Sequence, residues 1–580
     1  MSINKQIAKI FQNFADIYEI LSDEYKHDKT LKFKIRAYKQ AALTIENLAI
    51  DLRAIKDDPK ALDKIPGIGK TLAEKIHEYL TTGRISAYEK LSQEIPAGLL
   101  PMLDVPNLGP KKIKLFYDSL KIQNLEDLTA KIKDGTVETL PGMGKKSAEK
   151  ILESIEKINE RGQKFSFKEA RDEANDLIKH IQNKPELFEK INYAGSLRRA
   201  KIIVGDIDII CSSNKPELLK KHFHTYPEIS QLIAEGPTKI SVYLKSGVQL
   251  DFRVVKPDEF GAALQYFTGS KAHNVKLRTI AKNLGYKISE YGIFKLENGS
   301  QIKVGGQDEN DIYKTLGLPF IEPEIRENTG ELENLTTNNQ PQLIENIDIK
   351  GDLHSHSNFS DGKNTILEMA KKAEQLGYEY IAITDHSPTS YIANGLSTER
   401  LQDKKIAIAE AQSQTSIKIL FGTEVDILAD GSLDYPDEIL NQFDIVVASI
   451  HSGLNKDNTE RIIKAMNNKY VHIIGHPQTS MINKREASPN DWSKIFTNAK
   501  ATNTILEING SPQRLDLNGE LVYEAQKFGC LFSTNTDAHS TDGLNTMDLA
   551  IGQARRGQLN KEQVINTYSL NQLLKVIKNK

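Results

Sequence analysis

The chain contains 580 residues, which is too many for one hydrophobic core, so we expect three or more domains. Hydrophobic residues make up 39% of it and charged residues 27%, and these values exclude fibrous, low-complexity and membrane-spanning classes. Its two cysteines, Cys211 and Cys530, lie in apolar runs, which excludes a disulfide framework and a thiolate zinc site.

The formal net charge of −2 conceals a difference between two parts of the chain. Residues 1–320 contain 51 Lys and Arg against 43 Asp and Glu, whereas residues 321–580 contain 25 against 35. The basic part favours a polyanionic partner, and the acidic part suits multivalent cations better than open binding of DNA. Neither a secretion signal nor a membrane span is recognisable, so we expect a cytoplasmic protein with no membrane partner.

Apolar residues recur at helical spacing near the start of the chain, among them Ile7, Phe11 and Phe14, and predict a helix with one buried face. A second, more basic helix is expected over residues 31–48. A short unit then occurs three times, each time as a turn with Pro and small residues before a helix that begins with lysine. The three units are Ile65-Pro66-Gly67-Ile68-Gly69-Lys70, Val105-Pro106-Asn107-Leu108-Gly109-Pro110-Lys111-Lys112 and Leu140-Pro141-Gly142-Met143-Gly144-Lys145-Lys146.

Each repeated unit places free backbone N–H groups and a nearby lysine at the start of a helix, which suits a phosphate group. One such loop would equally fit an ordinary helix-to-helix turn, but three resemble the helix-hairpin-helix motif, which binds DNA phosphates independently of sequence. The resemblance implies phosphate contacts at Gly67, Gly69, Lys70, Gly109, Lys111, Gly142, Gly144 and Lys145. Asn107 departs from the pattern because the other units have glycine there, although Asn tolerates a left-handed backbone.

Two carboxylates lie one residue apart in the apolar run that follows Gly195-Ser196-Leu197-Arg198-Arg199. A strand sends alternate side chains to opposite faces, so Asp206 and Asp208 are expected on one face. Asp251, on a second alternating strand, supplies a third carboxylate. Such a set can hold Mg²⁺ for nucleotidyl transfer, whereas the alternative is an edge strand with acids on its outer face.

These residues resemble the palm signature of family X DNA polymerases, the group that includes DNA polymerase beta, over about residues 1–320. The resemblance implies that Asp206, Asp208 and Asp251 are the catalytic metal ligands. It also implies a nucleotide site whose residues are Gly195, Ser196, Arg199, Tyr266, Phe267, Gly269, Asn274 and Arg278. Ser196 and Arg199 would hold the phosphates of the incoming nucleotide, and Tyr266 and Phe267 would pack against its sugar.

Lys75, on the helix after the first repeated unit, matches the nucleophile of the 5′-deoxyribose-phosphate lyase that many family X enzymes carry. Lys34 and Tyr38 match supporting positions, but Thr71 and Phe33 replace basic residues of the family's lyase pocket. With fewer cations nearby to depress the pKa of Lys75, a phosphate contact is an equally good interpretation.

After about residue 346, short apolar runs end repeatedly in possible metal ligands and are followed by helical stretches. Ligands gathered at the ends of parallel strands are typical of an α/β barrel, here of about seven strands. The candidate ligands are His354, His356, Asp361, His386, Glu424, His451, His476, Asp537 and His539. This set can hold two or three ions, and it suits Zn²⁺, Mn²⁺ and Fe²⁺ equally.

The same motifs resemble the polymerase and histidinol phosphatase (PHP) domain over residues 347–580. That resemblance implies a distorted (β/α)₇ barrel with phosphoesterase activity and a site for a substrate phosphate near Arg514. An ion-paired surface arginine is an equally good interpretation of Arg514.

We therefore expect a multidomain protein with an all-α helix-hairpin-helix region, an α+β nucleotidyltransferase palm and a C-terminal barrel. The expected boundaries are an N-terminal domain over 1–90, a DNA-binding helical domain over 91–160, the palm over 161–256, a nucleotide-selecting subdomain over 257–320, a Pro- and Glu-rich linker over 321–346 and the PHP domain over 347–580.

The function that we predict is bacterial gap-filling DNA polymerisation in base excision repair, with 3′–5′ exonuclease and AP endonuclease activity in the PHP domain. Gapped or primed double-stranded DNA and dNTPs are the expected partners of a monomer near the nucleoid. The alternatives are an end-processing phosphoesterase with a weak palm, a DNA-binding scaffold, and a small-molecule or tRNA nucleotidyltransferase. The intact Asp206, Asp208 and Asp251 disfavour the first alternative, and two complete ligand sets disfavour the second. The hairpin repeats and the motif from Tyr266 to Arg278 disfavour the third.

Overall fold

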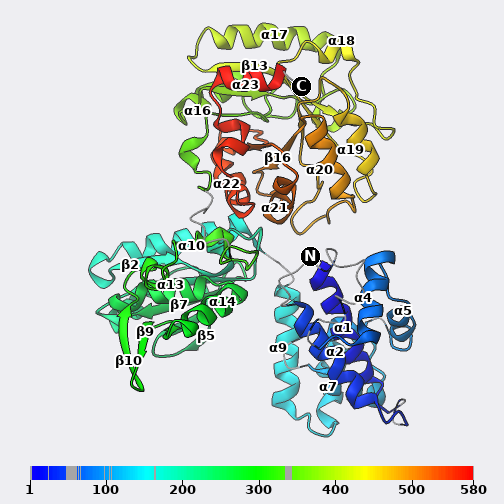
Figure 1. Ribbon diagram of the computed structural model, residues 1–580, viewed down its shortest axis with the longest axis vertical. Helices are drawn as coiled ribbons and strands as arrows, with labels where there is room; N and C mark the ends of the chain where they lie inside the picture. Colours follow the sequence, from blue (N-terminus) through cyan, green and yellow to red (C-terminus); the bar gives the residue numbers. More distant parts are fainter. Residues whose placement is uncertain are drawn as a thin grey trace. The chain divides into compact units, whose positions relative to one another are not determined.

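The computed structural model describes residues 3–580 except 24, 26, 47–51, 53–61, 63, 64, 66, 97, 104, 106, 107, 162–164, 334–341 and 579. The chain divides into two compact units, Met1–Gln163 and Lys164–Lys580. Figure 1 draws the first unit in blue and cyan and the second from cyan to red. Among the described residues, no helix is both long enough and apolar enough to cross a bilayer.

The first unit is entirely helical in its described part. Its helices are α1 (Ile3–Ile20), α2 (Leu31–Glu46), α4 (Lys70–Thr82), α5 (Ser86–Ser92), α6 (Leu99–Met102), α7 (Pro110–Leu120), α8 (Leu125–Lys133) and α9 (Lys145–Arg161). The predicted stripe of α1 is buried, and the ring of Phe14 stacks on that of Tyr38 with their centroids 4.5 Å apart. Apolar residues at helical spacing thus build one core for this unit, and this core includes residues of both expected domains, 1–90 and 91–160.

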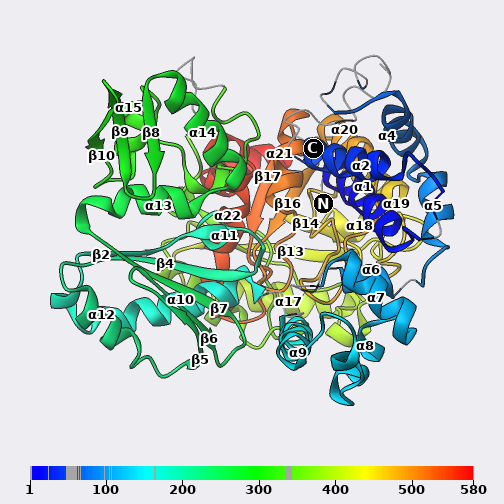
Figure 2. The same cartoon turned by 90° about the horizontal axis from the view of Figure 1, so that it is seen from below.

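The second unit begins with the expected palm region, which consists of a five-stranded sheet with helices packed on it. Its strands run in the order β2 (Lys190–Tyr193), β4 (Asp206–Ser212), β7 (Gln249–Val255), β6 (Lys239–Leu244) and β5 (Ile229–Glu235), side by side in Figure 2. The helices are α10 (Phe167–Gln182), α11 (Gly195–Arg198) and α12 (Pro216–Phe223). Ile207 and Ile209 are buried between the sheet and these helices, which leaves the intervening acids for the other face.

A smaller α+β subdomain follows the palm. It comprises α13 (Phe260–Thr268), α14 (Lys271–Asn283), α15 (Asn310–Thr315) and a three-stranded antiparallel sheet of β8 (Tyr286–Ser289), β9 (Gly292–Glu297) and β10 (Ser300–Gly305). The first half of the expected linker packs against this subdomain, because Ile321 and Ile325 belong to its core. Arg326 is fully buried and forms an ion pair with Glu309, 2.6 Å between Nη1 and Oε1. The segment expected as a linker is therefore folded up to at least Arg326.

Seven parallel strands form the C-terminal barrel in chain order: β11 (Gly351–Asp352), β12 (Tyr380–Ile383), β13 (Lys418–Asp426), β14 (Ile445–Ser449), β15 (Ile473–Ile474), β16 (Ile505–Asn509) and β17 (Phe532–Asn535). A bridge between Ser355 and Ala538 nearly closes the ring, which confirms the predicted architecture. The surrounding helices are α16 (Ile366–Gln375), α17 (Thr398–Gln412), α18 (Asp437–Leu440), α19 (Thr459–Met466), α20 (Trp492–Ala501), α21 (Gly519–Lys527), α22 (Met547–Arg556) and α23 (Leu570–Lys578), most of them visible in Figure 1.

The palm and the barrel share apolar contacts. Leu515 and Leu549 of the barrel belong to the core cluster of the palm. On α22, Gln553 donates a hydrogen bond to the carbonyl oxygen of Ala200 at 2.9 Å, and Arg556 donates one to that of Arg199 at 2.5 Å. The loop after α11 is thus held by a helix of the barrel.

Candidate active sites

The three palm carboxylates lie on two adjacent parallel strands. Asp208 on β4 is the register partner of Asp251 on β7, and Asp206 precedes it on the same strand. Burial and the negative charges of Asp206 and Asp251 raise the pKa of Asp208 to about 7. Lys239 on β6 forms an ion pair with Asp251. Crowded carboxylates of this kind repel one another, and a divalent cation would remove the repulsion, so the set fits Mg²⁺.

Gly195 allows the backbone at the start of α11 to approach these carboxylates. Its φ is +62°, and a Cβ atom at this position would lie 2.6 Å from Oδ2 of Asp208. Any side chain would therefore displace a carboxylate of the proposed cation site.

We expect Gly195→Ala to lower the rate of nucleotide incorporation by about 10- to 100-fold, because moving Asp208 costs transition-state stabilisation of that order. Gly247→Ala is the matched control, since Gly247 has a φ of +88° but open space around its Cβ position. Both substitutions strain a backbone with positive φ, but only Gly195→Ala displaces Asp208. The single-turnover rate of nucleotide incorporation, measured for both variants, therefore separates the two effects. Equal rates for both variants would contradict the role given to Gly195.

The two arginines after Gly195 are engaged within the protein. Arg198 pairs with Glu309 through two hydrogen bonds of 2.8 and 2.6 Å. Arg199 donates to Glu327 at 3.1 Å and to the carbonyl oxygen of Thr268 at 2.5 Å. For Arg199 to meet a phosphate, as its predicted role requires, the phosphate must share or replace Glu327. Ser196 is half-buried in the same turn.

The remaining predicted nucleotide residues lie on α13 and α14. The half-buried rings of Tyr266 and Phe267 meet edge to face with centroids 5.1 Å apart. Asn274 is buried and donates to the carbonyl oxygen of Tyr266 at 2.7 Å, which fixes its amide. Gly269 approaches the Arg199 guanidinium, and Arg278 is exposed on α14.

The barrel brings all nine predicted ligands together at the carboxyl ends of its strands, with Glu424 at the centre. Oxygens of Glu424 lie 2.9 Å from His386, 3.0 Å from His476, 3.3 Å from His451, 3.4 Å from His354 and 3.6 Å from His356. Although burial opposes it, the surrounding histidines lower the pKa of Glu424 well below its usual range. One carboxylate in contact with five rings is placed to bridge cations.

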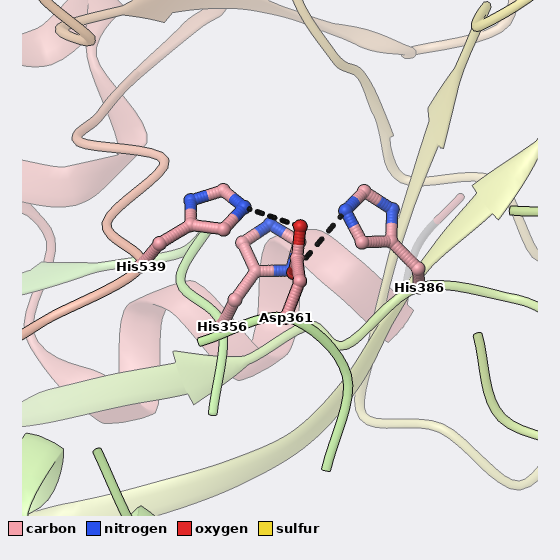
Figure 3. Close-up of side chains that lie close together, drawn as sticks. All are labelled: His356, Asp361, His386 and His539. Carbon is pink, nitrogen blue, oxygen red and sulfur yellow. Dashed lines mark ion pairs between the residues drawn. The ribbon is translucent and has the colours of Figure 1, made fainter. Parts of the chain in front are cut away.

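A second group surrounds Asp361. Figure 3 shows its carboxylate between the rings of His386 and His539, with His356 beside it; the shortest O···N distances are 3.7 Å to His386 and 3.3 Å to His539. These four residues offer ligand atoms close enough to share one ion. His354, His356 and Asp537 form another such group, and His386, Glu424 and His451 a third.

Several buried ring nitrogens of this cluster form no well-aligned hydrogen bond within the described part of the chain, even where a carboxylate oxygen lies close: His354 Nε2, both nitrogens of His356, His386 Nδ1 and His476 Nδ1. A buried polar atom without a partner is costly, and a cation supplies the missing interaction. His476 and Asp537 also have positive φ values, 27° and 54°, which are uncommon for non-glycine residues. The donor set therefore fits a cluster of divalent ions held by N and O ligands.

Comparison with known proteins agrees with this arrangement. Family models match residues 2–85 as a helix-hairpin-helix domain, 99–157 as a SAM-like helix-hairpin-helix tandem, 263–327 as a DNA polymerase beta thumb and 352–511 as a PHP domain. The chain is 39% identical to the DNA polymerase/3′-5′ exonuclease PolX of Bacillus subtilis (strain 168), over 98% of each chain. The chain belongs to the PolX family.

Two other relatives match parts of this PolX-family chain. A probable phosphatase of Thermoanaerobacter sp. (strain X514) is 30% identical over 37% of this chain and 89% of its own length. DNA polymerase lambda of Rattus norvegicus is 27% identical over 45% of this chain and 48% of its own length. The resemblances to family X polymerases and to the PHP domain, stated from the motifs, are thereby confirmed.

In this PolX-family chain, two further carboxylates hold predicted metal ligands in place. Glu507 on β16 accepts a hydrogen bond from Nδ1 of His354 at 2.7 Å, and Asp426 accepts one from Nδ1 of His451 at 2.7 Å. Each carboxylate leaves Nε2 of its histidine to face the cluster. Neither carboxylate is among the predicted ligands, because their contacts with the histidines depend on the packing of separate strands.

A buried ion pair supports the segment that carries Asp361. Lys404 on α17 lies 2.9 Å from Asp385, and both are almost fully buried. Asp385 accepts hydrogen bonds from the backbone N–H of Ser357 at 2.7 Å and from the hydroxyl of Ser360 at 2.8 Å. This pair therefore acts on the loop that ends at Asp361. Arg514 lies 3.8 Å from Asp537, at the edge of the cluster.

The hairpin turns in the first unit present open backbone at the helix starts. Gly69 and Gly109 precede α4 and α7 in extended conformations, and Gly67 and Gly142 have φ values of +83° and +76°. A Cβ atom at Gly69, Gly109, Gly142 or Gly144 would meet no atom of the described residues within 4 Å, so another molecule can approach there. Lys70, Lys111 and Lys145 lie exposed at the helix starts, and Asn107 lies outside the described residues.

The predicted lyase residues occupy different surroundings. Lys75 is half-buried on α4. Lys34 forms an ion pair with Asp28 at 2.7 Å, and Tyr38 is buried in the aromatic core against Phe14. The core position of Tyr38 gives it a packing role, while the chemical role of Lys75 stays a prediction.

Proposed function

We propose that this PolX-family chain fills short gaps in damaged DNA with its palm and trims 3′ ends with its barrel. The observation that carries the proposal is the presence of two complete ligand sets in one compact unit, the three carboxylates of the palm and the nine ligands of the barrel. The relative in Bacillus subtilis is named for both a polymerase and a 3′-5′ exonuclease activity. Base excision repair and cleavage at abasic sites belong to the same proposal.

In the palm, Asp206, Asp208 and Asp251 would hold Mg²⁺, which would neutralise charge on the triphosphate as the new bond forms. The turn from Gly195 to Arg199 would orient the phosphates, and the edge formed by Tyr266 and Phe267 would lie against the sugar. Asn274, fixed by its bond to the Tyr266 carbonyl oxygen, and Arg278 would contact the nascent pair.

In the barrel, two or three ions of Mn²⁺, Zn²⁺ or Fe²⁺ held by the nine ligands would stabilise negative charge on the phosphoryl group being cleaved. Glu507 and Asp426 would accept the Nδ1–H groups of His354 and His451, and so would hold each neutral ring with its Nε2 lone pair available to an ion. Arg514, beside Asp537, would meet a second oxygen of the phosphodiester.

One experiment tests both activities. The full chain is incubated with a 5′-labelled primer in a one-nucleotide gap, with and without dNTPs, in Mg²⁺ or Mn²⁺. We expect extension by added nucleotides when dNTPs are present and shortening from the 3′ end when they are absent. Shortening without any extension in either metal would instead identify an end-processing phosphoesterase with an inactive palm.

The hairpin turns of the first unit would bind the DNA backbone around the gap. We propose that gapped or primed duplex DNA and dNTPs are the substrates of a monomeric enzyme that acts at the bacterial nucleoid in the cytoplasm. Lys75 would either form a Schiff base with the abasic sugar or contact a phosphate; borohydride trapping distinguishes the two.

We expect Gly69→Val to weaken binding of DNA by about 3- to 10-fold, to a similar extent for unrelated sequences, because it obstructs backbone contact with phosphate. The open space at this position and its extended backbone allow valine without a clash. Fluorescence anisotropy over a range of salt concentrations measures the effect, with Thr81→Val at the far end of α4 as control. A loss confined to one sequence would contradict phosphate contact by this turn.

A further inference from the structure

Two large apolar side chains project into solvent beside the barrel's ligand cluster. Tyr391 is 85% exposed and Ile392 is fully exposed, the two highest values among the large hydrophobic residues that the structure describes. They form a single turn of 3-10 helix at the tip of the loop formed by residues 387–396, which follows the ligand His386. Packing among the described residues of the second unit does not account for these side chains.

The 387–396 loop is fixed at both of its ends to the ligand cluster. Ser387 donates its N–H to the carbonyl oxygen of Glu424 at 3.0 Å, and Leu396 donates its N–H to that of His386 at 2.8 Å. Two ligand residues thus anchor the base of the loop, and its tip cannot lie far from the cluster.

Side chains of the loop fasten the tip as well. The hydroxyl of Ser390 donates to Asp426 at 2.6 Å, the carboxylate that also holds His451. Asn394 donates to the carbonyl oxygen of Ser360 at 3.3 Å, next to the ligand Asp361. Tyr391 and Ile392 are therefore presented by a braced loop between two ligand-bearing segments.

The chemistry of this surface favours an unpaired base. The chain from residue 321 onward carries 25 basic against 35 acidic residues, so charge attraction for a DNA strand is poor there. Stacking on an aromatic ring needs no positive charge and accepts every base. Bases inside a duplex hide their faces, whereas a base at a frayed or single-stranded 3′ end exposes one.

We propose that Tyr391 and Ile392 form a stacking platform for the unpaired base at the 3′ end of the DNA strand whose terminal phosphodiester lies at the ligand cluster. This proposal rests on the proposed 3′ trimming by the barrel, and it adds a reason for the barrel to select among DNA 3′ ends. The platform gives single-stranded and mispaired 3′ ends an advantage over paired ones.

The test measures steady-state shortening of a single-stranded oligonucleotide by the full chain, with a normal 3′ nucleotide or with a 3′-terminal tetrahydrofuran residue that has no base. For the normal end we expect the double variant Tyr391→Ala/Ile392→Ala to raise KM about tenfold with little change in kcat, because loss of one stacked base has about this effect. On the baseless end the wild-type chain and the variant should have equal KM values.

Two further variants test whether the effect is specific to the aromatic ring of Tyr391. Tyr391→Phe should retain the wild-type KM, since stacking requires the ring and not the hydroxyl group. Phe528→Ala, which removes another partly exposed aromatic ring of the barrel, should also leave KM unchanged.

An unchanged KM for the double variant, or an equal increase on both substrates, would overturn the platform. A change in oligomeric state of the double variant, measured by mass photometry, would also overturn it and assign the surface to contact between copies of the chain. If the wild-type chain shortened neither substrate, the proposed 3′-trimming function itself would be wrong. This outcome is distinguishable from the others because they require a wild-type chain that is active.

Discussion

Asp251→Asn is expected to abolish primer extension, by about 10³-fold or more, while the barrel continues to shorten 3′ ends at the wild-type rate. Asp251 is 5% exposed and is the register partner of Asp208, so the loss of its charge falls directly on the proposed cation site. Asparagine has nearly the same shape, and β7 should therefore form unchanged. Incorporation of one nucleotide into a gapped duplex measures the effect.

The control for this substitution is Asp176→Asn on the exposed face of α10, where the side chain is 67% exposed. It removes the same charge from the same domain without touching the carboxylate set, and extension should persist. Loss of 3′ shortening in a folded Asp251→Asn protein would show that the two sites do not act independently.

Glu424→Gln should have the opposite selectivity. Five histidines surround this carboxylate, and an amide would present an N–H group where a cation is expected. We expect 3′ shortening to fall by about 10³-fold or more and the metal content per chain to fall with it, while extension continues. Elemental analysis of the purified protein and the labelled-primer assay provide the two readouts.

Glu410→Gln, on the exposed surface of α17, is the matched control and should change neither quantity. A Glu424→Gln protein with full metal content and full 3′ shortening would remove Glu424 from the centre of the cluster. A variant that retains its metal but loses shortening would place Glu424 in the chemistry and not in metal binding.

Much of both sites could be predicted from the sequence because their geometry follows from strand periodicity. Alternation places Asp206 and Asp208 on one face, with Ile207 buried on the other. Parallel strands of a barrel end at one rim, so predicted ligands such as His354 and Glu424, which are 70 residues apart in the sequence, are expected to meet there. Local periodicity and a repeated strand–helix order were sufficient in these cases.

Contacts that depend on tertiary packing could not be predicted in this way. Proline and glutamate around residues 319–333 are typical of a linker, yet Arg326 is buried against Glu309. Lys404 lies on an otherwise ordinary helix, and its pairing with Asp385 follows from the packing of α17 on the barrel. Likewise, the contact of Arg199 with Glu327 requires two segments that no local pattern connects.

The shared core of palm and barrel constrains how such a protein can change over generations. A deletion that removed the barrel would take Leu515 and Leu549 out of the palm's core and leave cavities there, besides releasing the carbonyl groups bound by Gln553 and Arg556. Substitution of a single ligand histidine would leave this scaffold intact. Homologues that lose the 3′-shortening activity should therefore keep an inactive barrel as a structural support. In such proteins we expect the ligand residues to be substituted and the residues of α22 to be retained.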